Sequence, residues 1–228
     1  MVGAAGLVSS AIRTGRGSGR PAGPQSFSSS PPLPAGGRLA ARVETTAAIL
    51  LRKTKLTETS LIVTWFSAAH GRIKTVAKGA RQPRSRFAGV LDLFYDCEIQ
   101  FVRSRKSELH ILREAELREP HEGMRLDYGR VALAAYFVEL IELVTEPDHP
   151  APELYDLLLR AFGFLDARAP TLRALLHFES ELVRLLGIQG QAGATPAAAI
   201  GRAYHHIPGS RPALLKALKA RDSIITPQ

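Results

Sequence analysis

The residues with the clearest chemical meaning are six basic side chains within residues 71–91, a stretch that contains no acid. They are Arg72, Lys74, Lys78, Arg81, Arg84 and Arg86. A strand-like run at 72–77 leads into a loop punctuated by Gly79, Pro83 and Gly89, with a cation every two or three residues. Positive charge concentrated in this way favours binding of a polyanion, most commonly the phosphodiester backbone of a nucleic acid. We expect a mobile strap that supplies affinity without sequence specificity.

Two further groups of cations accompany this run. Arg52, Lys53 and Lys55 form the first group, and Arg103, Arg105 and Lys106 form the second. Nearby aromatic rings could stack on bases, although each is more simply explained as a core residue: Trp65, Phe66, Phe87, Phe94 and Tyr95. If the six cations of the basic run each neutralised one phosphate of a single strand, log K would fall with log salt with a slope of about −4.

The distribution of charge says more than its total of +9. Residues 1–42 contribute +5 and residues 43–120 contribute +5, whereas residues 121–228 contribute −1. The chain has 23 Arg, 7 Lys and no Asn, a composition that a GC-rich coding sequence would give. Only the clustering of Arg is therefore evidence of function.

The sequence gives little evidence for catalysis, metal binding, disulfide bonds or a membrane span. P-loop, G-x-S-x-G and H-E-x-x-H patterns are absent, so we expect no enzyme and no cofactor. The single cysteine, Cys97, excludes a disulfide framework and a thiolate zinc cluster, and it is best explained as a small buried residue. His205 and His206 are adjacent but lack further ligands at a sensible spacing. Glu179 and Glu181 are most simply a solvated helix face. No run reaches the roughly 18 apolar residues of a membrane span.

Residues 1–42 are rich in Gly, Ser, Pro, Ala and Arg and have little apolar periodicity. Such a segment buries too little surface to offset its ordering entropy, so we expect a disordered basic tail. Upstream sequence included by a misassigned start codon and an organellar transit peptide remain open, because the segment is rich in Arg and Ser and lacks acids.

Period-two patterns follow from Val43 and predict five strands in about 75 residues. The runs are Thr45–Leu51, Leu61–Phe66, Arg72–Ala77, Leu93–Val102 and Leu109–Leu117. Short links at 68–71 and 103–107 are typical of hairpins, so a small barrel is favoured over an open sheet. A five-stranded barrel with a charged loop suits single-stranded nucleic acid.

After Pro120 the apolar period becomes helical. We expect helices at Arg125–Thr145, Glu153–Ala167 and Thr171–Leu186, with Leu172, Leu175, Leu176, Leu182, Val183 and Leu186 of the third directed inward. Residues 188–211 are poorly patterned, and Pro212–Arg221 could form a short final helix. The fold class is α+β and multidomain: a barrel followed by an all-α helical bundle.

Six short segments of the chain form a recognisable set: Glu58–Ser67 (ETSLIVTWFS), His70–Arg72 (HGR), Ala77–Arg81 (AKGAR), Ser85–Leu91 (SRFAGVL), Phe94 and Leu112–Leu117 (LREAEL). Together they resemble the RecO family of recombination mediators. The similarity extends over about residues 43–187 and is most specific at 58–94.

The resemblance implies an OB-fold, here at 43–119, followed by a helical domain at 120–187. Composition and pattern add the disordered tail at 1–42 and a short irregular C-terminal segment at 188–228 with a possible terminal helix. It implies a protein of DNA repair and recombination that binds single- and double-stranded DNA. Such a protein anneals complementary strands and helps RecA to load, with RecR, onto SSB-coated DNA. Contact with the SSB tail through the helical domain, no membrane partner and a bacterial cytoplasmic, nucleoid-associated location are also implied. Organellar import directed by residues 1–42 is the alternative location.

Two other functions suit the same charge and fold. One is an RNA-binding OB module, and the other is an adaptor whose basic face contacts an acidic protein. The chain also departs from the family pattern, because many relatives carry a four-Cys zinc module after the third helix. Residues 188–211 contain no Cys, so this module has no counterpart there.

Overall fold

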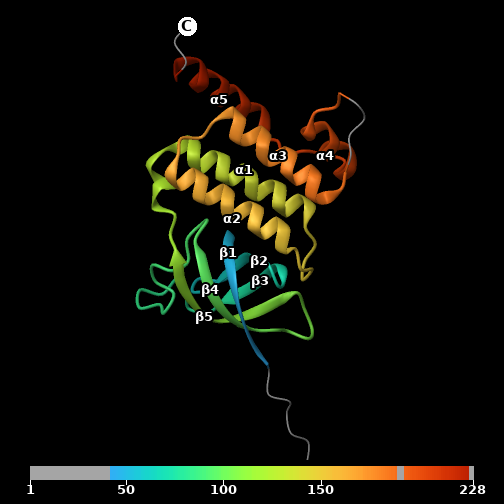
Figure 1. Cartoon of the computed structure of the whole chain (residues 1–228). Helices are drawn as coiled ribbons and strands as arrows, with labels where there is room; N and C mark the ends of the chain where they lie inside the picture. The colour runs from blue at the N-terminus through green and yellow to red at the C-terminus, as the bar shows by residue number, and fades with distance from the viewer. Residues whose placement is uncertain (1–41, 189–192, 226–228) are drawn as a thin grey trace, which may run out of the picture. The chain divides into compact units, whose positions relative to one another are not determined.

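The computed structural model describes residues 42–188 and 193–225, which form a five-stranded barrel followed by helices (Figure 1). The expected tail at 1–42 lies outside the described residues except for Arg42. The strands are β1 (Val43–Lys55), β2 (Leu61–Ser67), β3 (Gly71–Ala77), β4 (Asp96–Val102) and β5 (Leu109–Glu119). They close in the order β1-β2-β3-β5-β4, and every pairing is antiparallel except β3 with β5. This confirms the predicted OB-fold barrel.

Alternating side chains on the strands supply two cores. On β1, Ala48 and Leu50 point into the barrel, where they meet Trp65 and Phe101. Ile49 and Leu51 point the other way into the helical core. The burial of Trp65 is completed by a hydrogen bond of 2.9 Å from its indole N–H to the Thr75 hydroxyl. Period-two alternation therefore joins the barrel to the helices through one strand.

Residues 93–95 do not belong to β4, so the predicted start of this strand at Leu93 was wrong. Phe94 has a φ of 69°, outside the extended region, and its N–H donates to the Leu50 carbonyl at 2.8 Å. This turn directs the Phe94 ring into the helical core, where it meets Phe162 edge-on with 5.4 Å between centroids. Cys97 begins the buried face of β4, as predicted, and burial raises the pKa of its thiol to about 12.

The helices are η1 (Glu122–Leu126), α1 (Tyr128–Val144), α2 (Pro152–Ala167), α3 (Leu172–Leu186), α4 (Pro196–Tyr204) and α5 (Arg211–Ile225). Figure 1 shows α1 and α2 next to the barrel and α3, α4 and α5 beyond them. The helix expected at Arg125–Thr145 is interrupted because the Asp127 carboxylate accepts from the Gly129 N–H at 2.7 Å and begins α1. The sequence did not predict α4, which begins with Thr195 as N-cap and Pro196 in its first turn. Across the described ranges, no helix is long and apolar enough to cross a membrane.

The inward face of α3 is shifted from the predicted one. Leu175 and Leu182 are buried as expected, but Leu176 is 40% exposed. Phe178 and Glu179 are buried instead, so the prediction of Glu179 as a solvated residue was wrong. The Arg211 guanidinium contacts this carboxylate through two nitrogens, at 2.6 and 2.9 Å. A partner 32 residues away in sequence stabilises the buried charge.

Gly71 allows the barrel to approach the α1–α2 connection. Its φ is +63°, and a Cβ there would lie 1.8 Å from the His149 carbonyl oxygen. We expect Gly71→Ala to lower the free energy of unfolding by at least ~2 kcal/mol, because the left-handed backbone and the clash both oppose a side chain. Urea denaturation followed by circular dichroism measures this effect.

Gly163 provides the matched control for this prediction. It lies within α2, and a Cβ there would meet nothing within 4 Å. Gly163→Ala should raise the free energy of unfolding by about 0.5–1 kcal/mol, because alanine has the higher helix propensity. An equal change in the free energy of unfolding for the two substitutions would show that the close approach at Gly71 does not affect stability.

Candidate nucleic-acid interface

The twelve cations predicted to bind nucleic acid divide into two groups of six. In one group, the paired cations, each side chain bonds a carboxylate or a backbone carbonyl of the protein: Arg52, Lys53, Lys55, Arg72, Arg81 and Arg103. The other group, the unpaired cations, is exposed and has no side-chain hydrogen bond or ion pair to any described residue: Lys74, Lys78, Arg84, Arg86, Arg105 and Lys106. The sequence alone could not separate these groups.

The three cations of β1, Arg52, Lys53 and Lys55, each pair with an acid. Arg52 contacts both carboxylate oxygens of Glu142 on α1, which raises the pKa of its guanidinium. Lys53 binds Asp92 at 2.6 Å, and the hydrogen bond lowers the pKa of that carboxyl against the opposing effect of burial. Lys55 binds Glu58 at 2.6 Å. Because these three side chains are already paired with acids, we expect them to contribute less to phosphate binding than an unpaired cation would.

Arg72 and Arg103 connect the barrel to the segment around the end of α1. Arg72 donates to the carbonyls of Glu142 and Thr145 at 2.9 and 3.0 Å, where the negative end of the helix dipole lies. Arg103 bonds Glu44 and Asp148, and these contacts raise the pKa of its guanidinium. We therefore interpret both as positioning residues for the domain junction.

The unpaired cations follow β3 from end to end. Lys74 lies on the outer side of the middle of β3, paired in register with Thr64 on β2 and Leu109 on β5. Arg105 and Lys106 belong to the hairpin that precedes Leu109. Because β3 and β5 are parallel, this hairpin lies toward the start of β3. Lys78 directly follows the other end of β3, and Arg84 and Arg86 belong to the loop that continues from it toward β4. The seven residues of β3 span about 23 Å. A single strand of a few nucleotides matches such a length, as in other OB-folds.

The loop at 78–95 is anchored, contrary to the mobile strap that its Gly and Pro content suggested. The Phe87 ring is 3% exposed and packs into the barrel core. Successive turns are closed by backbone bonds from Ser85 to Gln82 and from Ala88 to Ser85, each 3.1 Å. Arg86 lies over the Phe87 ring, 4.8 Å from its centroid. This anchor restricts where the loop cations can project.

The aromatic residues near the basic run are not a stacking platform. Trp65, Phe66, Phe87 and Phe94 are buried, which confirms the core interpretation for these four. Tyr95 is half-buried, with the Arg125 guanidinium 5.1 Å above its ring. Binding at this surface would therefore rest on charge, and the base identity would have little influence.

A hollow of about 360 Å³ lies beside Lys74 on the outer face of β1, β2 and β3. Its lining residues include Lys74, the paired cations Arg52 and Arg72, and the polar residues Thr54 and Thr64. Glu142 is the single acid among its lining residues. Lys74 is the one unpaired cation among the lining residues, and it gives this concave surface a charge that suits a phosphate.

The outer face of β4 and β5 has the opposite charge. Glu98 on β4 stands directly opposite Glu116 on β5, and Glu114 stands opposite Gln100. All three carboxylates line a second hollow, whose other wall carries Arg86. Like charges in direct register repel each other and also repel phosphate. The acidic strands thus mark the border of the positive surface.

Removing this border should strengthen nucleic-acid binding. The triple substitution Glu98→Gln, Glu114→Gln and Glu116→Gln is expected to tighten ssDNA binding several-fold at 50 mM salt, because repulsion beside Arg86 disappears. Fluorescence anisotropy with a labelled oligonucleotide measures the affinity. Glu122→Gln, Glu146→Gln and Glu153→Gln make the same change in net charge on exposed acids of the helical part. Equal tightening by both triple variants would mean that only net charge matters.

The closed barrel with the strand order β1-β2-β3-β5-β4 places the protein among the OB-folds, here with exposed cations on its outer face. The sequence profile of Recombination protein O N terminal matches residues 42–121, and that of Recombination protein O C terminal matches residues 125–191. The chain belongs to the RecO family of DNA repair and recombination proteins.

Relatives named DNA repair protein RecO support the assignment. The chain is 37% identical to that of Rhodopirellula baltica over 140 residues, which is 61% of this chain and 52% of the relative. It is 37% identical to that of Pelobacter propionicus over 126 residues, 55% of this chain and 51% of the relative. The protein of Anaeromyxobacter dehalogenans is 33% identical over 140 residues, 61% of this chain and 55% of the relative. The chain thus aligns with about half the length of these curated relatives.

Proposed function

We propose that the protein is a non-enzymatic DNA-binding mediator of recombinational repair, which binds single- and double-stranded DNA and anneals complementary strands. The observation that carries this proposal is the track of unpaired cations along β3, bordered by the acidic face of β4 and β5. The DNA is held by neutralisation of its phosphates. Two strands bound to one cationic surface repel each other less, so they can pair.

Strand annealing with SSB-coated complementary oligonucleotides tests this function. Addition of the full chain should accelerate duplex formation at low salt, and the acceleration should fade at 200 mM salt because counterions compete for phosphate. A fluorophore and quencher on the two strands report the rate. An unchanged annealing rate at 50 mM salt would contradict the proposal.

RNA binding is the competing proposal, because the same surface would neutralise either backbone. Only membership in the RecO family favours DNA. Competition between ssDNA and ssRNA of matched length and sequence separates the two. Preferential displacement of labelled ssDNA by ssRNA would favour the RNA module.

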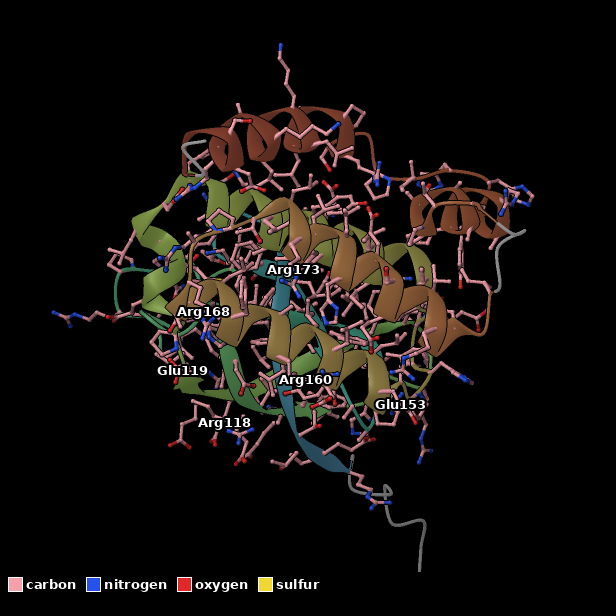
Figure 2. The ribbon with its side chains drawn as sticks, turned by 45° about the horizontal axis from the view of Figure 1, so that its top comes forward. Arg118, Glu119, Glu153, Arg160, Arg168 and Arg173 are labelled. Carbon is pink, nitrogen blue, oxygen red and sulfur yellow. The ribbon has the colours of Figure 1, made fainter. Side chains whose placement is uncertain are left out.

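Within the mediator role, we propose that the helical part binds the acidic tail of SSB and that RecR acts with the protein to load RecA. An apolar hollow of about 160 Å³ between α1, α2 and α3 supports the SSB contact. Phe137, Phe164 and Phe178 line it, and Arg160 and His177 add polar groups to its wall. Figure 2 shows Arg160 on α2, where its guanidinium also donates to the Asp156 carboxylate at 2.8 Å. An acidic peptide with an apolar residue fits this combination.

Arg160→Ala tests the SSB contact separately from DNA binding. The variant should weaken capture of the SSB-tail peptide and leave ssDNA affinity unchanged, because Arg160 lies on α2 and not on the β3 track. A peptide without its terminal residues is the control ligand. Undiminished binding of the full peptide would remove this hollow from the proposal and would point to an adaptor surface elsewhere.

A further inference from the structure

Three potential metal ligands meet where the barrel joins the helices. Glu119 ends β5, His121 precedes η1, and Asp166 lies in the last turn of α2. One ligand atom from each of the three lies within 4.8 Å of the other two. Figure 2 shows Glu119 near Arg168, the residue that follows the end of α2. The cluster is separate from the β3 track.

Two members of the cluster carry buried atoms that lack a hydrogen-bond partner. His121 is 4% exposed, and its Nε2 has no partner among the described residues. Asp166 Oδ1 is likewise buried and unpartnered. Buried polar atoms are nearly always satisfied, so each such atom requires an explanation.

The backbone around the cluster is held in place by other contacts. The Arg130 guanidinium donates to the carbonyls of Gly123, Leu165 and Asp166 at 3.0, 3.1 and 2.7 Å. A Cβ at Gly123 would lie 2.1 Å from the Asp166 carbonyl oxygen, so only glycine allows η1 to approach α2 this closely. The backbone at Gly123 and Asp166 is thereby fixed, whereas Glu119 is exposed and its side chain can adjust.

We propose that Glu119, His121 and Asp166 bind a divalent transition-metal ion, Zn²⁺ foremost, that fastens the end of the barrel to the end of α2. One imidazole and two carboxylates suit this class of ion, whereas Ca²⁺ and Mg²⁺ prefer oxygen ligands alone. Metal–ligand bonds of about 2.0–2.2 Å would bring the ligand atoms to about 3.3 Å from one another. Rotation of the three side chains, most freely of the exposed Glu119, supplies this closure, and water can take the fourth position.

Metal content and thermal stability of the full chain test the proposal. Protein stripped with EDTA and titrated with ZnCl₂ should bind one equivalent by mass spectrometry of the elements, and its Tm should rise by several degrees. His121→Ala should abolish both effects. Asp166→Asn keeps the shape of the side chain and should weaken Zn²⁺ binding at least tenfold, which guards against misfolding of the histidine variant.

A second histidine pair provides the control. His205 and His206 are exposed and adjacent at the end of α4. The double variant His205→Ala and His206→Ala should keep the Zn²⁺-dependent rise in Tm. Loss of the rise in this double variant, its survival in both His121→Ala and Asp166→Asn, or an equal rise with CaCl₂ would overturn the proposal. Absence of any rise with ZnCl₂ would overturn it as well.

Discussion

Alanine at Lys74, Lys78, Arg84 and Arg86 together should weaken ssDNA binding at least tenfold while the fold survives. These four side chains are exposed and unpaired among the described residues, so their removal breaks no internal ion pair or side-chain hydrogen bond. Each cation that neutralises a phosphate releases a counterion, and four contacts account for about −3 of the salt slope for a single strand. The loss in affinity should therefore be largest at low salt.

Fluorescence anisotropy at 50 mM salt measures this effect, with circular dichroism as the check on folding. The control variant carries alanine at four exposed cations of the helical part: Arg173, Arg202, Lys216 and Lys219. It makes the same change in net charge and should cost far less affinity. Equal losses in the two variants, or no loss in the first, would remove the β3 track from the binding surface.

Glu179→Ala should cause the largest loss of stability, about 3–5 kcal/mol, because it leaves charge and a hydroxyl buried without a partner. Glu179 is fully buried on α3 and accepts from the Tyr136 hydroxyl at 2.5 Å as well as from Arg211. The contact joins α1, α3 and the start of α5. It also raises the pKa of the Arg211 guanidinium.

Urea denaturation measures the loss, and the double variant Glu179→Ala with Arg211→Ala identifies its cause. The double variant should be less destabilised than the sum of the single variants, because it leaves no unpaired charge. Arg184→Ala breaks the exposed pair with Glu181 and should leave the denaturation midpoint nearly unchanged. A midpoint for Glu179→Ala close to that of Arg184→Ala would contradict a buried, stabilising pair.

Sequence patterns were sufficient to predict those strands and helices whose residues show a clear apolar periodicity. Period-two alternation predicted five strands, and helical periodicity with Pro147, Pro152 and Gly187 nearby placed α1, α2 and α3 within a few residues. The turn at Phe94 and the short helix α4 were missed. Phe94 follows the alternation of β4, and the chain turns there because of two long-range contacts, the hydrogen bond to Leu50 and the packing on Phe162. The helix α4 is only nine residues long and rich in Ala, so it offers few large apolar residues from which a helical period could be recognised.

The candidate site was predictable only in outline. Clustering of charge located the basic loop, but it could not show which cations already had partners. Arg52 pairs with Glu142, and Arg103 pairs with Asp148, at separations of 90 and 45 residues. Such pairs depend on how the helices dock on the barrel. The same limit applies to His121 and Asp166, which only the docking of α2 brings together.

The salt dependence of ssDNA affinity tests the central claim most directly, because its slope counts neutralised phosphates. Titrations between 50 and 200 mM salt should give a slope of about −4 for the unchanged chain, as expected for the six unpaired cations. Alanine at Lys74, Lys78, Arg84 and Arg86 should reduce the slope to between −1 and −2, at about −0.7 for each contact that remains. A slope near zero for the unchanged chain, or an identical slope for the variant, would contradict a DNA-binding track along β3.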